Sequence, residues 1–359
     1  MIIGGYVLYN FLELAFVFFF SLTSLFFLRK IAANIGLVDT PSARKMHQGQ
    51  VPLVGGLSLC ICLLYFLFNN PDIIHHAHVY ASCIVVLVIV GTIDDKYDLE
   101  VKYRLIIQFF LSVAMIYLAK IEIHTLGELL SQGETIKLNW IRYVITVLAV
   151  MGAMNAFNMV DGLDGLLGGL SIVTFGALGA LLLLNGQTNT SYLCLVIVAA
   201  MVPYIMLNLG VFGHQRKVFM GDAGSMLVGY TVIWFLLLSS QDLPQPSVRP
   251  VTALWLIAIP LMDMVAIMIK RIREGKSPFK PDRQHLHHIC QHNGMSPAQT
   301  LIVICSVSSV FAFIGMLGEA FKVPEYLMFY GFLLCFAGYL VVIHRLQEET
   351  MQRTVHPQL

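Results

Sequence analysis

Two amides and two carboxylates fall within ten residues of this chain, where an apolar segment ends. The segment reads Asn155-Ala-Phe-Asn158-Met-Val-Asp161-Gly-Leu-Asp164-Gly165. The polar residues recur at every third position, and residues three apart on a helix are neighbours, so they could form one polar strip. The glycines suggest that the helix opens here and leaves its backbone free to approach a ligand. Alternatively, the amides join transmembrane helices, although the acids would still need partners.

Two adjacent carboxylates, Asp94 and Asp95, close a second apolar stretch and are followed by Lys96. Magnesium prefers oxygen ligands and often bridges one or two carboxylates to substrate phosphates. The pair could therefore hold a divalent cation or position a phosphate. A solvated helix end with a local ion pair is the alternative, because a dipeptide is a weak signal.

A third acidic site is Asp222, in the segment Val218-Phe-Met-Gly-Asp-Ala-Gly-Ser225. It lies near an expected helix N-terminus, where a carboxylate is electrostatically favoured. The flanking glycines and the preceding basic pair also suit a nucleotide diphosphate with a metal ion. Phe219 could stack on a base or serve as an anchor at the membrane interface.

The loop at 270–298 combines a basic run with the cluster His285-Leu-His287-His288. The basic run alone is typical of positive-inside topology or attraction to anionic lipids. Three histidines within four residues can donate to phosphate oxygens or ligate a transition metal. No second cluster of Cys or His accompanies them, so phosphate contacts are favoured. Lys45 could likewise contact an anionic substrate or simply belong to a basic loop.

Composition places these residues on a membrane protein. The chain has 359 residues, of which 57% are hydrophobic and only 12% charged, against about 25% charged in soluble domains. A net charge of +1 supplies no global field that would recruit nucleic acid. The spacing of the seven cysteines predicts neither a disulfide framework nor a thiolate zinc site. We therefore expect an all-α integral membrane protein.

The apolar pattern predicts about eleven transmembrane helices. They cover residues 6–28, 51–69, 79–93, 105–119, 141–158, 166–184, 191–207, 224–240, 251–269, 299–318 and 325–343. With the N-terminus outside, the inside loops and the cytoplasmic C-terminal tail hold 17 of the 22 Lys and Arg residues, which follows the positive-inside rule. We expect one polytopic domain over 1–343, a short cytoplasmic tail at 344–359, and an external loop at 120–140.

This predicted topology puts the acidic motifs and the histidine cluster on the cytoplasmic side. A transporter would place its ionisable groups near the bilayer midplane, and only Glu13 and Asp263 lie well within expected spans. Neither receives a functional assignment. A transporter of an anionic solute and a non-catalytic membrane scaffold remain the alternatives from other classes. The sidedness favours chemistry at the inner surface, with the site built from cytoplasmic loops.

The motifs resemble those of the polyprenyl-phosphate N-acetylhexosamine-1-phosphate transferases over nearly the whole chain. The matching segments are Lys45–Gly56, Asp94-Asp95, Asn155–Leu166, Val218–Ser225, Pro260–Met268 and Asp282–His288. The His-Leu-His-His pattern differs from the loop of the peptidoglycan branch. It favours the branch that uses a simpler amino-sugar nucleotide.

The resemblance implies roles for individual residues. It implies a catalytic set of Asp94, Asp95 and Asp222, with the separate roles of the adjacent pair left open. It implies metal ligation by Asp222, Asn158 and Asp94. Nucleotide contacts are expected from Phe219, Asp161, Asp164 and Lys45. Phosphate or sugar contacts are expected from Arg283, His285, His287, His288 and Lys96.

The resemblance also implies the reaction. UDP-GlcNAc and undecaprenyl phosphate would give undecaprenyl-diphospho-GlcNAc and UMP, with Mg²⁺ or alternatively Mn²⁺ as cofactor. This would be the first membrane step of O-antigen or enterobacterial common antigen synthesis, in the bacterial inner membrane. Another UDP-HexNAc donor is the closest alternative. The expected partners are these two substrates and the bilayer, without nucleic acid; a homodimer remains open.

Overall fold

The computed structural model describes residues 2–40, 49–241, 246–278 and 284–355, with side chains described between 11 and 348. It is all-helical, with 74% helix and almost no strand. The α-helices and the 3₁₀ turn η1 are α1 (Ile2–Ile35), α2 (Gly55–Asn69), α3 (Ala77–Tyr97), α4 (Val101–Leu118), α5 (Arg142–Met159), α6 (Leu166–Leu184), α7 (Thr188–Asn208), η1 (His214–Arg216), α8 (Gly221–Ser240), α9 (Pro250–Leu256), α10 (Ala258–Arg273), α11 (Leu286–His292), α12 (Pro297–Ala320) and α13 (Glu325–Val355).

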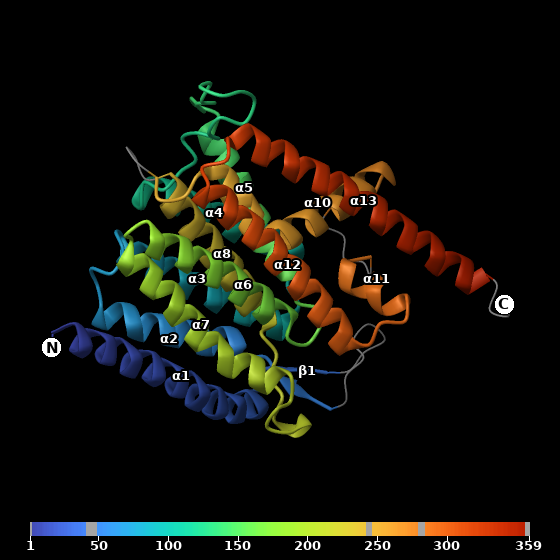
Figure 1. Cartoon of the computed structure of the whole chain (residues 1–359). Helices are drawn as coiled ribbons and strands as arrows, with labels where there is room; N and C mark the ends of the chain where they lie inside the picture. The colour runs from blue at the N-terminus through green and yellow to red at the C-terminus, as the bar shows by residue number, and fades with distance from the viewer. Residues whose placement is uncertain (1, 41–48, 242–245, 279–283, 356–359) are drawn as a thin grey trace.

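Helix α8 forms the centre of the bundle, and nearly all of its residues are buried. It packs against α2, α3, α5, α6 and α9, while α1 and α13 lie on the outside (Figure 1). Its N-terminus is approached closely by two neighbours, because Gly56 of α2 abuts Gly224 and Gly91 of α3 abuts Ala223. A side chain at either glycine would overlap the α8 backbone, so these glycines set where α8 begins.

The helix expected over 251–269 is two helices, α9 and α10, that meet at an angle of 83°. The cause is Pro260, which lacks an N–H and whose ring clashes with the carbonyl four residues earlier. That carbonyl belongs to Leu256, and it accepts a hydrogen bond from Thr174 Oγ1 of α6 at 3.1 Å instead. The bend was not predicted, because the apolar pattern continues through it.

A small ladder covers the same end of the bundle as the α8 N-terminus. Strands β1 (Val38–Asp39) and β2 (Val51–Pro52) pair antiparallel, and Leu53 forms a parallel bridge with Phe219. The backbone N–H of Phe219 donates to the carbonyl of Pro52 at 2.9 Å, and the carbonyl of Phe219 accepts from the N–H of Gly55 at 3.0 Å. The expected helix at 51–69 therefore begins at Gly55, because the residues before it are extended and paired with the segment that precedes α8.

The polar motifs gather at one end of the bundle and the predicted external loops at the other. The 120–141 segment contains no helix and runs beside the ends of α12 and α13 (Figure 1). At that end Arg249 donates to Glu319 at 3.2 Å and also to the carbonyl of Gly318. The loops that follow α3, α5 and α7 lie at the opposite end. The motifs expected on one side therefore lie at one end of the bundle, and the cytoplasmic location of that end stays a prediction.

Each of the eleven predicted spans falls on helix, but with changed ends. Among the described residues, eight helices are long and apolar enough to cross a membrane, or nine if α9 and α10 count as one span. This supports a multi-pass membrane protein and leaves the number eleven a prediction. The predicted tail at 344 begins inside a helix, because α13 continues through good helix-forming residues to Val355.

We predict that Gly91→Ala destabilises the protein by about 1–3 kcal/mol, the usual cost of overpacking a tight contact. The added methyl would overlap the backbone of Ala223. Thermal unfolding in detergent measures the loss. Gly176→Ala is the matched control, because open space surrounds Gly176 in α6 and alanine favours a helix. Equal midpoints for both variants would contradict the close approach of α3 and α8.

Candidate active site

Four side chains from four helices converge at the N-terminus of α8. Arg104 of α4 lies between two carboxylates, 3.3 Å from Asp94 Oδ2 and 3.1 Å from Asp222 Oδ2. Asn158 at the end of α5 donates through Nδ2 to Asp222 Oδ1 at 2.6 Å and to Ser225 Oγ at 2.8 Å. Asp94 is buried, whereas the side chain of Asp222 is 36% exposed. The cluster thus has one open carboxylate that a ligand can reach.

The adjacent acids Asp94 and Asp95 have different surroundings. Asp95 Oδ1 accepts from the backbone N–H of Asp222 at 2.7 Å, and Oδ2 accepts from Ala223 at 3.2 Å. It therefore caps α8, whose first amides have no partner within the helix. Asp94 Oδ1 accepts from the backbone of Leu99 at 2.8 Å. Its Oδ2 is buried and has no hydrogen-bond donor in the described part of the chain, apart from the ion pair with Arg104.

The loop between α5 and α6 carries Asp161 and Asp164 beside this cluster. Removal from water, followed by repulsion from Asp222 and Asp164, raises the pKa of Asp161 to about 7. Asp164 pairs with Lys217 at 2.5 Å. Asn208 holds the two loops together: it accepts from the backbone of Gly165 at 2.5 Å and donates to the carbonyl of Val218 at 3.0 Å.

The histidine cluster begins α11 and packs against the same loop. His285 Nδ1 lies 2.9 Å from Asp263 Oδ2, and its ring is parallel to that of His287 at a centroid distance of 6.0 Å. His287 fills the space beside Gly162, where any Cβ would overlap its imidazole. Burial, and then the neighbouring His288 and His285, lowers the pKa of His287 to about 3. His287 is therefore neutral at physiological pH.

Not every predicted residue joins the cluster. Lys96 is exposed and lies over the Tyr97 ring at 5.4 Å, and Asn155 donates to Gln108 Oε1 at 2.8 Å in a contact between α5 and α4. Phe219 is half-buried in the strand before α8. Lys45 and Arg283 lie outside the described residues, so their roles remain predictions.

Two residues important to this geometry were missed from the sequence. Arg104 links the two carboxylates, and Asp263 holds the histidine cluster. A signal existed for the first, because Arg104 and Gln108 are polar residues four apart in an apolar helix and so share one face. For Asp263 the signal was a carboxylate within an apolar helix, because burying its charge is unfavourable unless it has partners. The sequence does not identify those partners.

The oxygen atoms of this cluster suit a magnesium ion. Among the described residues no three His, Cys, Asp or Glu side chains form a metal site by themselves. Magnesium, however, is usually held by one or two carboxylates together with substrate phosphates. Asp222 is the exposed carboxylate that meets that need, and Asp94 lies on the other side of Arg104 as the second acid. Asn158 directs its amide nitrogen at Asp222 and Ser225, and its amide oxygen is the atom that would ligate a metal.

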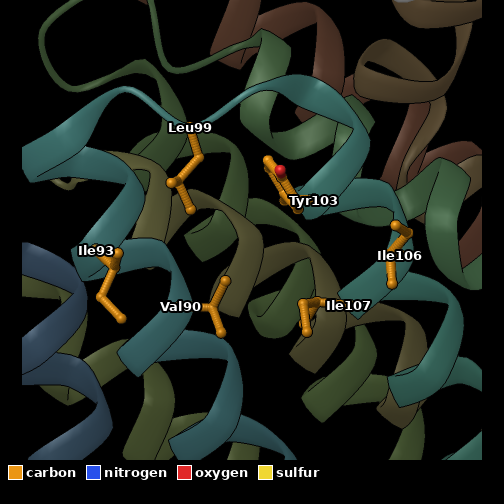
Figure 2. Close-up of a pocket in the computed structure, with 6 residues that line it drawn as sticks. All are labelled: Val90, Ile93, Leu99, Tyr103, Ile106 and Ile107. Atoms are coloured by element: carbon orange, nitrogen blue, oxygen red, sulfur yellow. The ribbon is translucent and has the colours of Figure 1, made fainter.

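An apolar groove opens beside the cluster between α3 and α4. Its volume is about 320 Å³, and it is lined by Val90, Ile93, Leu99, Tyr103, Ile106 and Ile107. Figure 2 shows Leu99 in the connection between the two helices and the remaining side chains converging from both of them. Leu99, which lines the groove, also donates its backbone N–H to Asp94 of the polar cluster. An apolar chain and its polar headgroup could thus be held together.

Comparison with known proteins identifies similar chains. The sequence model of glycosyl transferase family 4 matches residues 77–240. The chain is 47% identical to the undecaprenyl-phosphate alpha-N-acetylglucosaminyl 1-phosphate transferase of Yersinia pestis, over 93% of this chain and 91% of that protein. It is 48% identical to the proteins of that name from Escherichia coli K12 and Pasteurella multocida, again over 93% of this chain and over 90% and 93% of theirs.

We predict that Asp95→Asn destabilises the protein by about 1–3 kcal/mol, because one α8 amide then faces an N–H₂ group and loses its acceptor. Thermal unfolding in detergent measures the loss. Asp98→Asn is the matched control: Asp98 is exposed, and its φ of 51° is one that asparagine tolerates. If Asp95→Asn unfolds no earlier than Asp98→Asn, the capping role is wrong.

Proposed function

This chain belongs to the polyprenyl-phosphate N-acetylhexosamine-1-phosphate transferases, and we propose that it transfers GlcNAc-1-phosphate from UDP-GlcNAc to undecaprenyl phosphate. The products would be undecaprenyl-diphospho-GlcNAc and UMP. The observation that carries the proposal is the convergence of Asp94, Arg104, Asn158 and Asp222 at one end of an apolar bundle. The names of the relatives support the acceptor and the transferred group.

The main barrier to this reaction is charge, because the attacking and the attacked phosphates are both anionic. Catalysis of phosphoryl transfer consists mostly of positioning and electrostatic stabilisation. Arg104 supplies a guanidinium that can pair with phosphate oxygens in a two-pronged geometry. It now pairs with two carboxylates, so a metal that occupies those carboxylates would leave Arg104 available to a phosphate.

We favour direct attack by the lipid phosphate on the sugar-bound phosphorus. A phosphate monoester has a second pKa near 6, so it is mostly ionised at neutral pH and needs little help from a base. Neither member of the acid pair is placed as a nucleophile. Asp95 uses both oxygens to cap α8, and Asp94 is 3% exposed and paired with Leu99 and Arg104.

Bound Mg²⁺, or Mn²⁺, would neutralise the diphosphate charge, held by Asp222, Asp94 and the amide oxygen of Asn158. The donor nucleotide would lie toward the loops that carry Phe219, Asp161 and Asp164. Asp161, with its pKa raised to about 7, adds less negative charge near the diphosphate than an ordinary aspartate would. His285 and His288 of the histidine cluster would contact the sugar and its phosphate.

The membrane would bring the acceptor to the site. The groove between α3 and α4 gives the prenyl chain an apolar surface that includes Leu99, whose backbone N–H donates to Asp94. In this arrangement the site lies on the cytoplasmic face of the bacterial inner membrane, with the N-terminus outside. The product would enter synthesis of O-antigen or enterobacterial common antigen.

The direct test is a transfer assay in membranes that contain the protein. Radiolabelled UDP-GlcNAc, undecaprenyl phosphate and Mg²⁺ should give lipid-extractable label and an equal amount of UMP, and EDTA should abolish both. Asp222→Ala should remove nearly all turnover. UDP-GalNAc and the muramyl nucleotide, offered in parallel, determine the donor. Absence of labelled lipid with every donor would overturn the proposal, and UMP release without acceptor would overturn direct attack.

We predict that Arg104→Gln lowers kcat about 100-fold, the scale of losing one preorganised charge-stabilising donor, and raises KM for undecaprenyl phosphate. Steady-state kinetics with each substrate varied in turn measures both. Lys102→Gln is the matched control, because Lys102 lies on the same helix, is 57% exposed and pairs with Glu100. Similar kinetics for the two variants would contradict a role for Arg104 at the phosphate.

A further inference from the structure

A buried carboxylate outside the catalytic cluster joins three helices at the histidine loop. Asp263 of α10 is 3% exposed. Its Oδ1 accepts from the backbone N–H of Leu286 at 3.0 Å and from Tyr339 Oη of α13 at 2.8 Å. Its Oδ2 faces His285 Nδ1 at 2.9 Å. Two of its three partners, the Leu286 amide and the Tyr339 hydroxyl, are donors, and both donate to Oδ1.

The pairing determines how the His285 ring is protonated. A carboxylate oxygen accepts hydrogen bonds, so the 2.9 Å contact with Oδ2 assigns the ring proton to Nδ1 of His285, which donates it to Asp263. The second ring nitrogen, Nε2, is then the atom left for another partner, and the ring cannot rotate without breaking the pair. Histidine tautomers are commonly fixed in this way by a carboxylate on the far nitrogen.

The same contact positions the rest of the histidine loop. His285 lies parallel to His287, and His287 packs against Gly162 in the loop that carries Asp161 and Asp164. Leu286, whose amide Asp263 also binds, is the first residue of α11. Asp263 therefore holds the start of α11 at a fixed place against the loop on the donor side.

We propose that Asp263 is a positioning residue of the transfer reaction, which fixes the tautomer and orientation of His285 toward the sugar-phosphate of the nucleotide donor. The inference rests on the proposed function. Tyr339 supports Asp263 from α13 through Oδ1, whereas His285 faces Oδ2. The last helix of the chain is thereby linked to the site through one hydroxyl group.

Asp263→Asn is the sharpest variant, because asparagine keeps the shape of the side chain. To keep its oxygen toward Leu286 and Tyr339, it must present its N–H₂ group to His285 Nδ1, which then has to accept, so the proton moves to Nε2. We expect kcat to fall roughly 10- to 100-fold, the usual effect of losing such an orienting partner, with KM for undecaprenyl phosphate unchanged. Tyr339→Phe is the control: it removes one donor, keeps the tautomer, and should cost at most about fivefold.

A double-mutant cycle separates positioning from general structural damage. If Asp263 acts through His285, then adding Asp263→Asn to a His285→Gln variant should lower kcat by at most about a further twofold. The reason is that both substitutions remove the same interaction. Losses that multiply in the double variant, or wild-type kcat in Asp263→Asn, would overturn the inference. Thermal midpoints in detergent identify variants that fail to fold. If Asp263→Asn is one of them, the kcat values of Tyr339→Phe, His285→Gln and their double variant are compared instead. Absence of transfer by the wild-type protein would instead overturn the proposed function.

Discussion

The site depends on one tertiary helix cap, in which Asp95 of α3 accepts the free amides of Asp222 and Ala223 at the start of α8. The positive end of a helix dipole stabilises an anion there. The contact is close because Gly91, one helical turn before Asp95, lets α3 approach the same residues of α8. Because Asp95 binds these amides, α8 begins at a position from which the Asp222 side chain can face a ligand.

The cap also brings like charges together, and the neighbouring side chains offset the repulsion only in part. At the opposite end of the bundle two acids each have a base of their own: Glu122 pairs with Arg142, and Glu319 pairs with Arg249. At the site end Asp94 and Asp222 share the single guanidinium of Arg104. Such an excess of negative charge lowers the stability of the folded protein unless a cation binds. A local loss of stability of this kind is expected at a functional site.

The sequence predicted the helices and the grouping of motifs well, because both follow from local pattern. Each predicted apolar run falls on helix, although the short α11 was missed and one run covers both α9 and α10, and the charge pattern placed the acidic motifs together. It could not separate Asp94 from Asp95, since adjacent residues of equal chemistry point about 100° apart on a helix and only the packing of α8 decides which one caps it. The bend at Pro260 and the link through Arg104 likewise depend on which helices are neighbours.

The histidine cluster shows most clearly why residue type alone does not determine a role. All three histidines were expected to contact phosphate or sugar, but His287 is buried, neutral and packed on Gly162. That glycine was interpreted as leaving room for a ligand, and the room is taken by the imidazole. His287 therefore adds no positive charge where the diphosphate is expected. In the proposed reaction that charge would come from Arg104, Lys217 and a bound metal ion, while His287 fixes the distance between two loops.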